Sequence, residues 1–97
     1  MPGRPRHPKT DANQPDIIRD LRKCGLIVHD VSSLGGDCLD LFVGDPQSYQ
    51  WLQIEVKTDE GQLTPRERAY IAVHLPRLPI VVARRAEDVL IALGSIR

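Results

Sequence analysis

Long apolar segments are missing from this sequence of 97 residues. The longest apolar runs, such as residues 79–83, are far shorter than the roughly 18 residues of a membrane-spanning helix. No apolar stretch follows the basic, proline-rich start, so no secretory signal is predicted and we expect a cytoplasmic protein. An excess of either charge is also missing, because thirteen Lys and Arg residues balance thirteen Asp and Glu residues. A nucleic-acid partner would therefore have to meet a local basic patch.

Motifs of several common enzyme classes are absent as well. The two cysteines, Cys24 and Cys38, are isolated and are expected to act as small apolar side chains, without a redox or metal role. The three histidines do not have the spacing of zinc ligands. There is no P-loop, no dinucleotide-binding glycine fingerprint and no serine-nucleophile elbow, since Gly35 and Gly36 precede a strand-like segment rather than a helix. We therefore expect no nucleotide cofactor.

The chain is long enough for one domain. Residues 1–12 are expected to be a flexible basic arm, because their prolines and cations leave nothing to bury, and residues 13–97 to be the folded domain. Asn13 can cap a first helix that ends at Gly25. The apolar stripe of this helix is expected to comprise Ile17, Ile18, Leu21 and Cys24.

The remaining pattern predicts an α/β fold. Strand-like segments lie at residues 26–31, 38–43 and 51–57, and residues 44–48 have the composition of a hairpin loop that pairs the last two antiparallel. A capping box of Thr64, Pro65 and Glu67 starts a second helix that runs to Leu75. A strand at residues 80–83 and a helix with Ala86, Val89, Leu90 and Leu93 on its buried face close the chain. The order αβββαβα indicates a mixed β-sheet flanked by helices.

Three chemically informative residues lie in the two middle strands. Asp40 interrupts a segment that is otherwise apolar, and a buried carboxylate needs a reason. Because side chains alternate along a strand, Glu55 and Lys57 lie side by side on one face. If the hairpin register places Asp40 beside Glu55, two carboxylates and one ammonium group converge within about 5 to 8 Å.

Such a cluster can hold a divalent cation. Mg²⁺ prefers hard oxygen ligands and keeps several waters, so Asp40, Glu55 and the peptide carbonyl of Val56 make a plausible site with a substrate phosphate. The metal would polarise a phosphodiester and lower the pKa of a bound water, while Lys57 orients that water or stabilises negative charge. A plain salt bridge between Lys57 and Glu55 at a solvated strand end explains the spacing equally well.

The segments GGDCLDL at residues 35–41, IEVK at residues 54–57 and LTP at residues 63–65 together resemble a known family. They are similar to the small phage and prophage VRR-NUC-like nucleases of the PD-(D/E)XK superfamily, over residues 11–93. The resemblance implies a restriction-endonuclease-like core. It also implies that Asp40 and Glu55 bind Mg²⁺ or Mn²⁺ and that Lys57 assists hydrolysis. The expected setting is the cytoplasm of a bacterial host of a phage or prophage.

Two features of the family apply less directly. A polar or acidic residue of the first helix often completes the family's site, and the candidates here are Asn13, Gln14 and Asp16, although helix capping explains Asn13 and Asp16 equally well. Leu39 stands where the family usually has proline. Glu67 stands where relatives usually carry a glutamine that contacts the site, and the capping box already explains Glu67.

The expected activity is divalent-metal-dependent hydrolysis of DNA phosphodiester bonds by a homodimer, with duplex, branched or junction DNA as substrate, as the resemblance implies. Few aromatic residues are present and they form no interleaved stacking platform, so backbone recognition is favoured over stacking on single strands. The alternative is a catalytically silent nucleic-acid-binding or assembly module with the same fold. Candidate cations for the DNA backbone are Arg4, Arg6, Lys9, Arg66, Arg68, Arg84 and Arg85.

Overall fold

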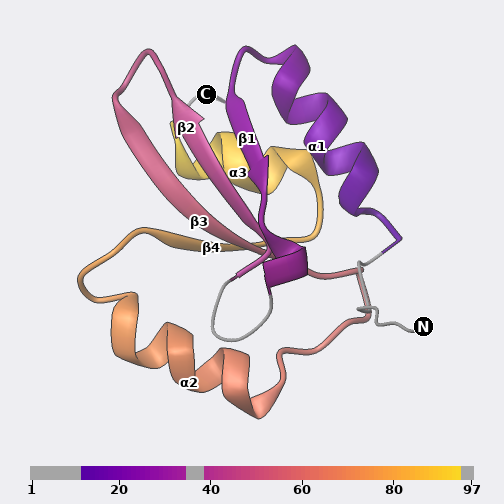
Figure 1. Cartoon of the computed structure of the whole chain (residues 1–97), viewed down its shortest axis with the longest axis vertical. Coiled ribbons are helices and arrows are strands. Elements are labelled where there is room, and N and C mark those ends of the chain that lie inside the picture. The colour runs from indigo at the N-terminus through magenta and orange to yellow at the C-terminus, as the bar shows by residue number, and fades with distance from the viewer. Residues whose placement is uncertain (1–11, 35–38, 95–97) are drawn as a thin grey trace.

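The computed structural model describes residues 12–34 and 39–94, which form one mixed sheet with helices packed on it (Figure 1). The predicted order αβββαβα is confirmed, with a short 3-10 helix added after the first strand. No helix in this described part of the chain is both long and apolar enough to cross a membrane. The elements are α1 (Gln14–Lys23), β1 (Ile27–Asp30), η1 (Ser32–Leu34), β2 (Leu41–Asp45), β3 (Gln50–Val56), α2 (Pro65–His74), β4 (Ile80–Ala83) and α3 (Ala86–Ala92).

The sheet has the strand order β1-β2-β3-β4, and its pairing explains which face of each strand is buried. The first three strands are antiparallel neighbours, whereas β4 runs parallel to β3 because α2 connects them as a crossover. Alternate residues of β3, among them Leu52 and Ile54, point to the face that α1 and α3 cover. The predicted α/β class with a mixed sheet is therefore confirmed.

The core lies between this face of the sheet and the two helices α1 and α3. Ile17 and Leu21 lie four residues apart on one side of α1 and are both buried, as predicted. Cys24 is exposed, so its predicted place in the apolar stripe is wrong; α1 ends at Lys23 and Gly25, with φ +86°, turns the chain away. Cys38 lies outside the described residues. The buried cluster comprises Ile17, Leu21, Leu26, Val28, Leu41, Val43, Leu52, Ile54, Val56, Ala83 and Val89.

The β2–β3 hairpin is longer than the sequence pattern indicates. Gly44 and Asp45 pair with Trp51 and Gln50 in the ladder, so the predicted loop at residues 44–48 is displaced to residues 46–49. The Asp45 carboxylate closes the turn by accepting hydrogen bonds from the Gln47 amide at 3.0 Å and the Ser48 hydroxyl at 2.7 Å. Glycine is needed at position 44 of this strand, because a Cβ atom there would lie 2.9 Å from the ring of Trp51.

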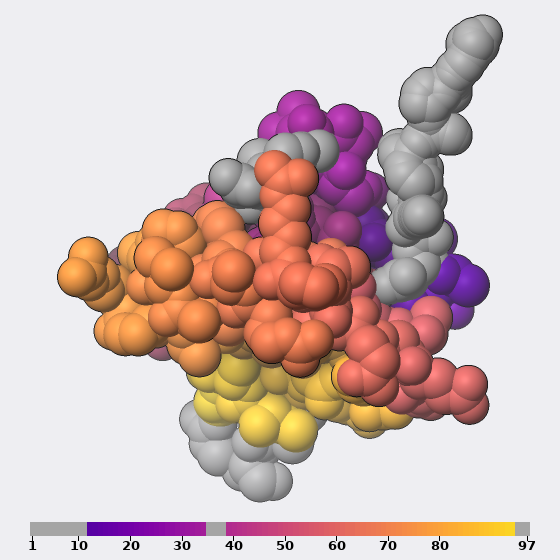
Figure 2. All heavy atoms as spheres, turned by 90° about the horizontal axis from the view of Figure 1, so that it is seen from below, coloured from indigo at the N-terminus to yellow at the C-terminus, as the bar shows by residue number. Residues whose placement is uncertain are grey.

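Helix α2 lies on the opposite face of the sheet and buries none of its residues. The Tyr70 hydroxyl donates a hydrogen bond of 2.8 Å to the Gln53 side chain, which points away from the core face that Leu52 and Ile54 share. Figure 2 shows α2 in orange across the near face, with the yellow α3 below it. The sheet therefore has one sealed face and one face that is only partly covered.

Candidate functional site

The adjacent ends of β2 and β3 bring Asp40 next to Glu55, as the hairpin register predicts. The Asp40 amide donates to the Ile54 carbonyl at 3.0 Å, and the Val56 amide donates to Asp40 Oδ2 at 2.8 Å. Asp40 therefore precedes β2 rather than interrupting it, because its carboxylate takes the place that a main-chain acceptor would have in a continued ladder. The reason for a carboxylate in an apolar segment is thus visible in the backbone pairing.

Glu55 and Lys57 point to the same face of the sheet, as alternation along β3 predicts. Lys57 Nζ lies 3.5 Å from Glu55 Oε2, and the two side chains are only 12% and 5% exposed, respectively. The contact between Lys57 and Glu55 that the sequence suggests therefore exists, but its predicted setting at a solvated strand end is wrong. Packing against the loop before α2 and against α2 itself removes both groups from bulk water, and a buried contact between a lysine and a carboxyl group is weak evidence for a purely stabilising role.

Glu67 reaches this cluster from α2 and has two roles. Its Oε1 accepts the Thr64 amide at 2.9 Å while the Glu67 amide donates to the Thr64 hydroxyl, so the predicted capping box is confirmed. The same oxygen lies 2.9 Å from Lys57 Nζ. Helix capping therefore does not exclude a contact with the cluster, because one carboxylate oxygen has enough lone pairs for both donors.

The electrostatics of the cluster favour a neutral Glu55 in the absence of a cation. Burial, the negative charge of Asp40 and the contact with Glu67 raise the pKa of Glu55 from 4.5 to about 9. Burial would also raise the pKa of Glu67, but hydrogen bonds from Lys57 and the Thr64 amide outweigh it and lower that pKa. The lysine charge thus acts mainly on Glu67, which is the nearer carboxylate, and Glu55 keeps its proton.

Asn13 connects the start of α1 to the cluster. Its Nδ2 donates to the main-chain carbonyls of Lys57 at 3.0 Å and Arg84 at 2.9 Å, so one amide joins α1 to the ends of β3 and β4. Asn13 occupies the N-cap position of α1, but its side chain makes no capping hydrogen bond, which corrects the prediction. The strand-end carbonyls compete for the amide, and its Oδ1 is buried without a hydrogen-bond partner among the described residues.

The other two candidates on α1 differ in their setting. Gln14 is 1% exposed, and its Nε2 lies 3.3 Å from Asp30 Oδ1 and 3.5 Å from Ser32 Oγ. Asp16 is exposed and pairs with Arg19 at 3.1 Å on the helix surface. The structure therefore brings Asn13 against the cluster, buries Gln14 one residue further on, and leaves Asp16 on the outside.

The predicted backbone-binding cations are partly engaged within the protein. The Arg84 guanidinium donates to the carbonyls of Thr58 and Gly61, which holds the loop after β3 against the end of β4. Arg85 pairs with Asp59 at 2.7 Å. Arg66 and Arg68 lie on the exposed surface of α2, where Arg68 also donates to the Leu63 carbonyl at 3.1 Å. The predicted contacts of Arg4, Arg6 and Lys9 fall outside the described residues.

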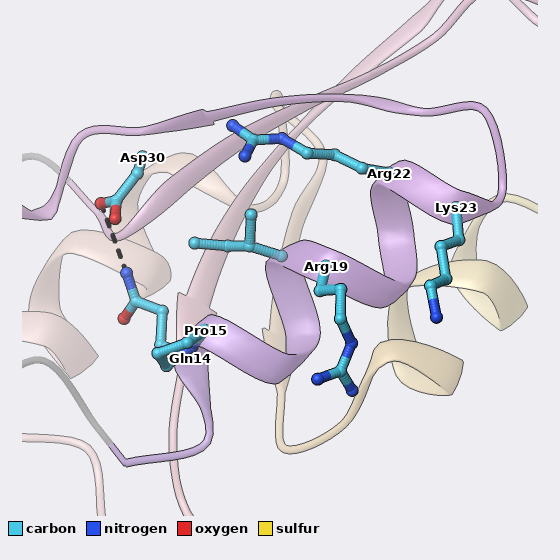
Figure 3. Close-up of a pocket in the computed structure, with 7 residues that line it drawn as sticks. Gln14, Pro15, Arg19, Arg22, Lys23 and Asp30 are labelled. Carbon is cyan, nitrogen blue, oxygen red and sulfur yellow. Dashed lines mark hydrogen bonds between the residues drawn. The ribbon is translucent and has the colours of Figure 1, made fainter.

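A groove beside α1 is lined by further basic side chains, which the sequence analysis did not single out. It has a volume of about 640 Å³, and Figure 3 shows Gln14 and Asp30 facing each other at one end and Arg22 and Lys23 at the other. Arg22 donates to the Val28 carbonyl at 2.8 Å and so covers the free edge of β1. Basic residues in the last turn of α1 complement its helix dipole, which is the signal that could have identified them.

The donor atoms of the cluster suit a hard cation. The Val56 amide points toward Asp40. The N–H and C=O groups of one strand residue point to the same neighbouring strand, so the Val56 carbonyl is directed to that side as well. Two carboxylates and a carbonyl, completed by water and phosphate oxygens, are typical of Mg²⁺. Among residues 12–34 and 39–94 no three His, Cys, Asp or Glu side chains are grouped to hold a metal, so the cluster offers two carboxylates rather than a complete protein cage.

Comparison with known proteins supports the architecture. No protein-family model matches the sequence, and no curated protein matches it. Among solved structures, the chain is similar to a VRR_NUC domain with 18% sequence identity and a TM-score of 0.63, over 87% of this chain and 92% of that one. The resemblance found in the sequence motifs is therefore confirmed at the level of the fold.

Proposed function

We propose that this chain, which has the fold of a VRR_NUC domain, is a Mg²⁺- or Mn²⁺-dependent endonuclease that hydrolyses DNA phosphodiester bonds. The observation that carries the proposal is the convergence of Asp40, Glu55 and Lys57 at the adjacent ends of β2 and β3. Two carboxylates beside a buried ammonium group suit phosphoryl chemistry, in which charge must be neutralised on an anionic substrate.

Each residue of the cluster has a distinct task in this mechanism. Asp40 and Glu55, with the Val56 carbonyl, would hold the cation, which supplies polarisation of the phosphodiester and a water of lowered pKa when bound. The Val56 amide fixes the Asp40 carboxylate at the start of β2, next to Glu55. Lys57 places a positive charge beside the phosphate, and Glu67 restrains its side chain from α2.

The proposed substrate is duplex or branched DNA, and the proposed assembly is a homodimer. A domain of this size presents one cluster, so two copies are needed to address both strands of a duplex. Cleavage at junctions would follow from shape and backbone contacts rather than base readout, because no described helix has the setting of a recognition helix. Arg66 and Arg68 on α2 are the described cations nearest in sequence to Glu67 and are the first candidates for phosphate contacts.

The proposal is tested by incubating purified protein with duplex and four-way-junction DNA in Mg²⁺ or Mn²⁺. We expect metal-dependent strand cleavage that Asp40→Asn and Lys57→Ala each lower by about 100-fold or more, because each removes one charge that acts on the scissile phosphate. Asp16→Asn is the matched control, since Asp16 is an exposed carboxylate on α1. Cleavage that is equally fast in wild type and in both cluster variants would refute the assignment.

A catalytically silent nucleic-acid-binding module is the second candidate. The observation that favours it is the 2.9 Å contact of Lys57 with Glu67, which is shorter than its 3.5 Å contact with Glu55 and so draws the lysine charge away from the cation site. Binding of junction DNA without cleavage, equally tight in wild type and Asp40→Asn, would identify this function.

A further inference from the structure

The partly covered face of the sheet carries exposed aromatic and apolar side chains that α2 leaves uncovered. Ile27 is 46% exposed, Phe42 39% and Trp51 52%, and Tyr49 at the tip of the β2–β3 hairpin is 91% exposed. In Figure 1 this tip stands at the upper left, at the opposite end of the sheet from α2. We call these four residues the aromatic patch. Side chains of this size and exposure are informative when they gather in one place.

Trp51 is held in place on the surface of the sheet. Its ring lies across Gly44 on the neighbouring strand, where a Cβ atom would come within 2.9 Å of the indole. The same ring stacks on His29 of β1, with 5.9 Å between ring centroids and 13° between planes. The indole is therefore pre-organised on the sheet while half of it remains exposed, which lowers the entropic cost of binding against it.

Tyr49 is exposed at a cost to the backbone. Its φ of +60° lies in the left-handed region, where a bulky residue is strained and glycine or asparagine is favoured. The Tyr49 amide donates to the Asp45 carbonyl at 2.9 Å, so the turn holds it in that conformation. The strain is not offset by burial, because the ring is almost fully exposed. Strain of this kind points to a role for the side chain outside its own fold.

A hollow of about 230 Å³ lies directly beside this projecting ring, and Ile27, Gly44 and Trp51 contribute to its wall. A projection next to a hollow makes a surface self-complementary, as an isologous contact needs, because each copy can insert its projection into the hollow of the other. We propose that two copies of this chain pair through the aromatic patch, with Tyr49 of each copy seated in the hollow of the other. This rests on the homodimer of the proposed function and names its surface.

The charges of the region argue for a protein rather than a nucleic-acid occupant. Neither the aromatic patch nor the wall of the hollow contains Lys or Arg. The one charged residue in the wall of the hollow, Asp45, is an acid. Nucleic acid binds chiefly through cations that meet its phosphates, so stacking rings without cations are a poor match for it. A second copy of the same neutral, apolar surface has no such mismatch.

The size of the patch predicts a weak dimer. Phe42, Tyr49 and Trp51 expose roughly 350 Å² of aromatic surface, given about 150–250 Å² for a whole aromatic side chain. With Ile27 and a polar rim, this falls in the class of small interfaces that bury less than about 600 Å² on each partner. We expect a dissociation constant on the order of 10 µM.

The test measures self-association of the whole chain by sedimentation equilibrium across about 1 to 300 µM, around the expected dissociation constant. Trp51 is the single tryptophan of the sequence, so its emission reports the patch directly and should shift to shorter wavelength as the dimer forms. Tyr49→Gly should weaken association by about 30-fold or more. The same change should leave the monomer folded, because glycine accepts φ +60° without strain.

Ile91→Ser is the matched control for Trp51→Ser, because Ile91 is an apolar residue of similar exposure on α3, beyond the other face of the sheet. The proposal is supported if Tyr49→Gly and Trp51→Ser each associate about 30-fold or more weakly than the wild type while Ile91→Ser dimerises like the wild type. A wild type that stays monomeric at the highest concentration overturns it, as does a Tyr49→Gly dimer of unchanged affinity. Quenching of Trp51 by a metal-free oligonucleotide, without self-association, would assign the patch to base stacking instead. Because none of these readouts involves cleavage, they separate this surface from the nuclease proposal.

Discussion

Glu55→Gln is expected to lower DNA cleavage by about 1,000-fold and, at the same time, to stabilise the metal-free protein. Cleavage falls because glutamine cannot supply the charged oxygen that the cation site needs. Stability rises because Glu55 is buried beside Asp40 and Glu67, so its negative charge is unfavourable when no cation is bound. A substitution that removes function and adds stability is typical of a residue held for its chemistry.

The pH dependence of this effect has a definite sign. The pKa of Glu55 is raised from 4.5 to about 9, so between these values the folded protein holds a proton that the unfolded chain has released. The free energy of unfolding must therefore fall as pH rises through this window, and the contribution is fully lost above the folded pKa. Glutamine mimics the protonated acid at every pH. The variant should match wild type near pH 5 and exceed it by about 1–2 kcal/mol near pH 9, allowing for solvent screening.

Urea unfolding of the metal-free proteins at pH 5, 7 and 9 measures the difference. Glu87→Gln, at an exposed position of α3, controls for the loss of one negative charge and should show no such trend. Equal stability of Glu55→Gln and wild type at all three pH values would mean that the Glu55 carboxyl is solvated and ionised in the fold.

Asn13→Ala is expected to cost about 2–3 kcal/mol of stability, because it leaves the main-chain carbonyls of Lys57 and Arg84 without their donor. Both carbonyls lie at strand ends beside the cluster, so a looser Lys57 backbone should also lower the cleavage rate. Alanine removes the amide without adding bulk, and no helix cap is lost because the Asn13 side chain makes no capping hydrogen bond.

Chemical unfolding and single-turnover cleavage of this variant give the two readouts. Asp16→Ala, in the first turn of the same helix, is the control and should lose at most a few tenths of a kcal/mol with its surface ion pair. Asn13→Asp restores side-chain size but not the two donated hydrogen bonds, so it should behave like alanine. Full stability in Asn13→Asp would contradict the role assigned to the amide.

The cluster could be predicted from the sequence because its three residues lie at the ends of the two strands of one hairpin. Alternation along β3 places Glu55 and Lys57 on one face, and the antiparallel register places Asp40 beside Glu55. The first strand residue of β2 was misplaced, because a side-chain carboxylate replaces a main-chain acceptor at that point and no propensity scale records such a substitution.

The contacts that sequence reasoning missed join segments far apart in the chain. The Asn13 amide meets carbonyls 44 and 71 residues away, and its local sequence favours a helix cap equally well. The contact of Glu67 with Lys57 was similarly hidden behind its capping role. The aromatic patch escaped notice because Trp51 reaches across Gly44 to a histidine on a third strand, a proximity that only the sheet creates.

Helix α2 has a consequence for motion. It is fastened by the Thr64 cap, the Tyr70 hydroxyl and the pairing of Glu67 with Lys57, and none of its side chains enters the core. Local opening therefore exposes little apolar surface, so its amides should exchange with deuterium orders of magnitude faster than those of β2 and β3. An element that lifts so readily could admit a rigid substrate that the closed form excludes, while the sheet beneath keeps its shape.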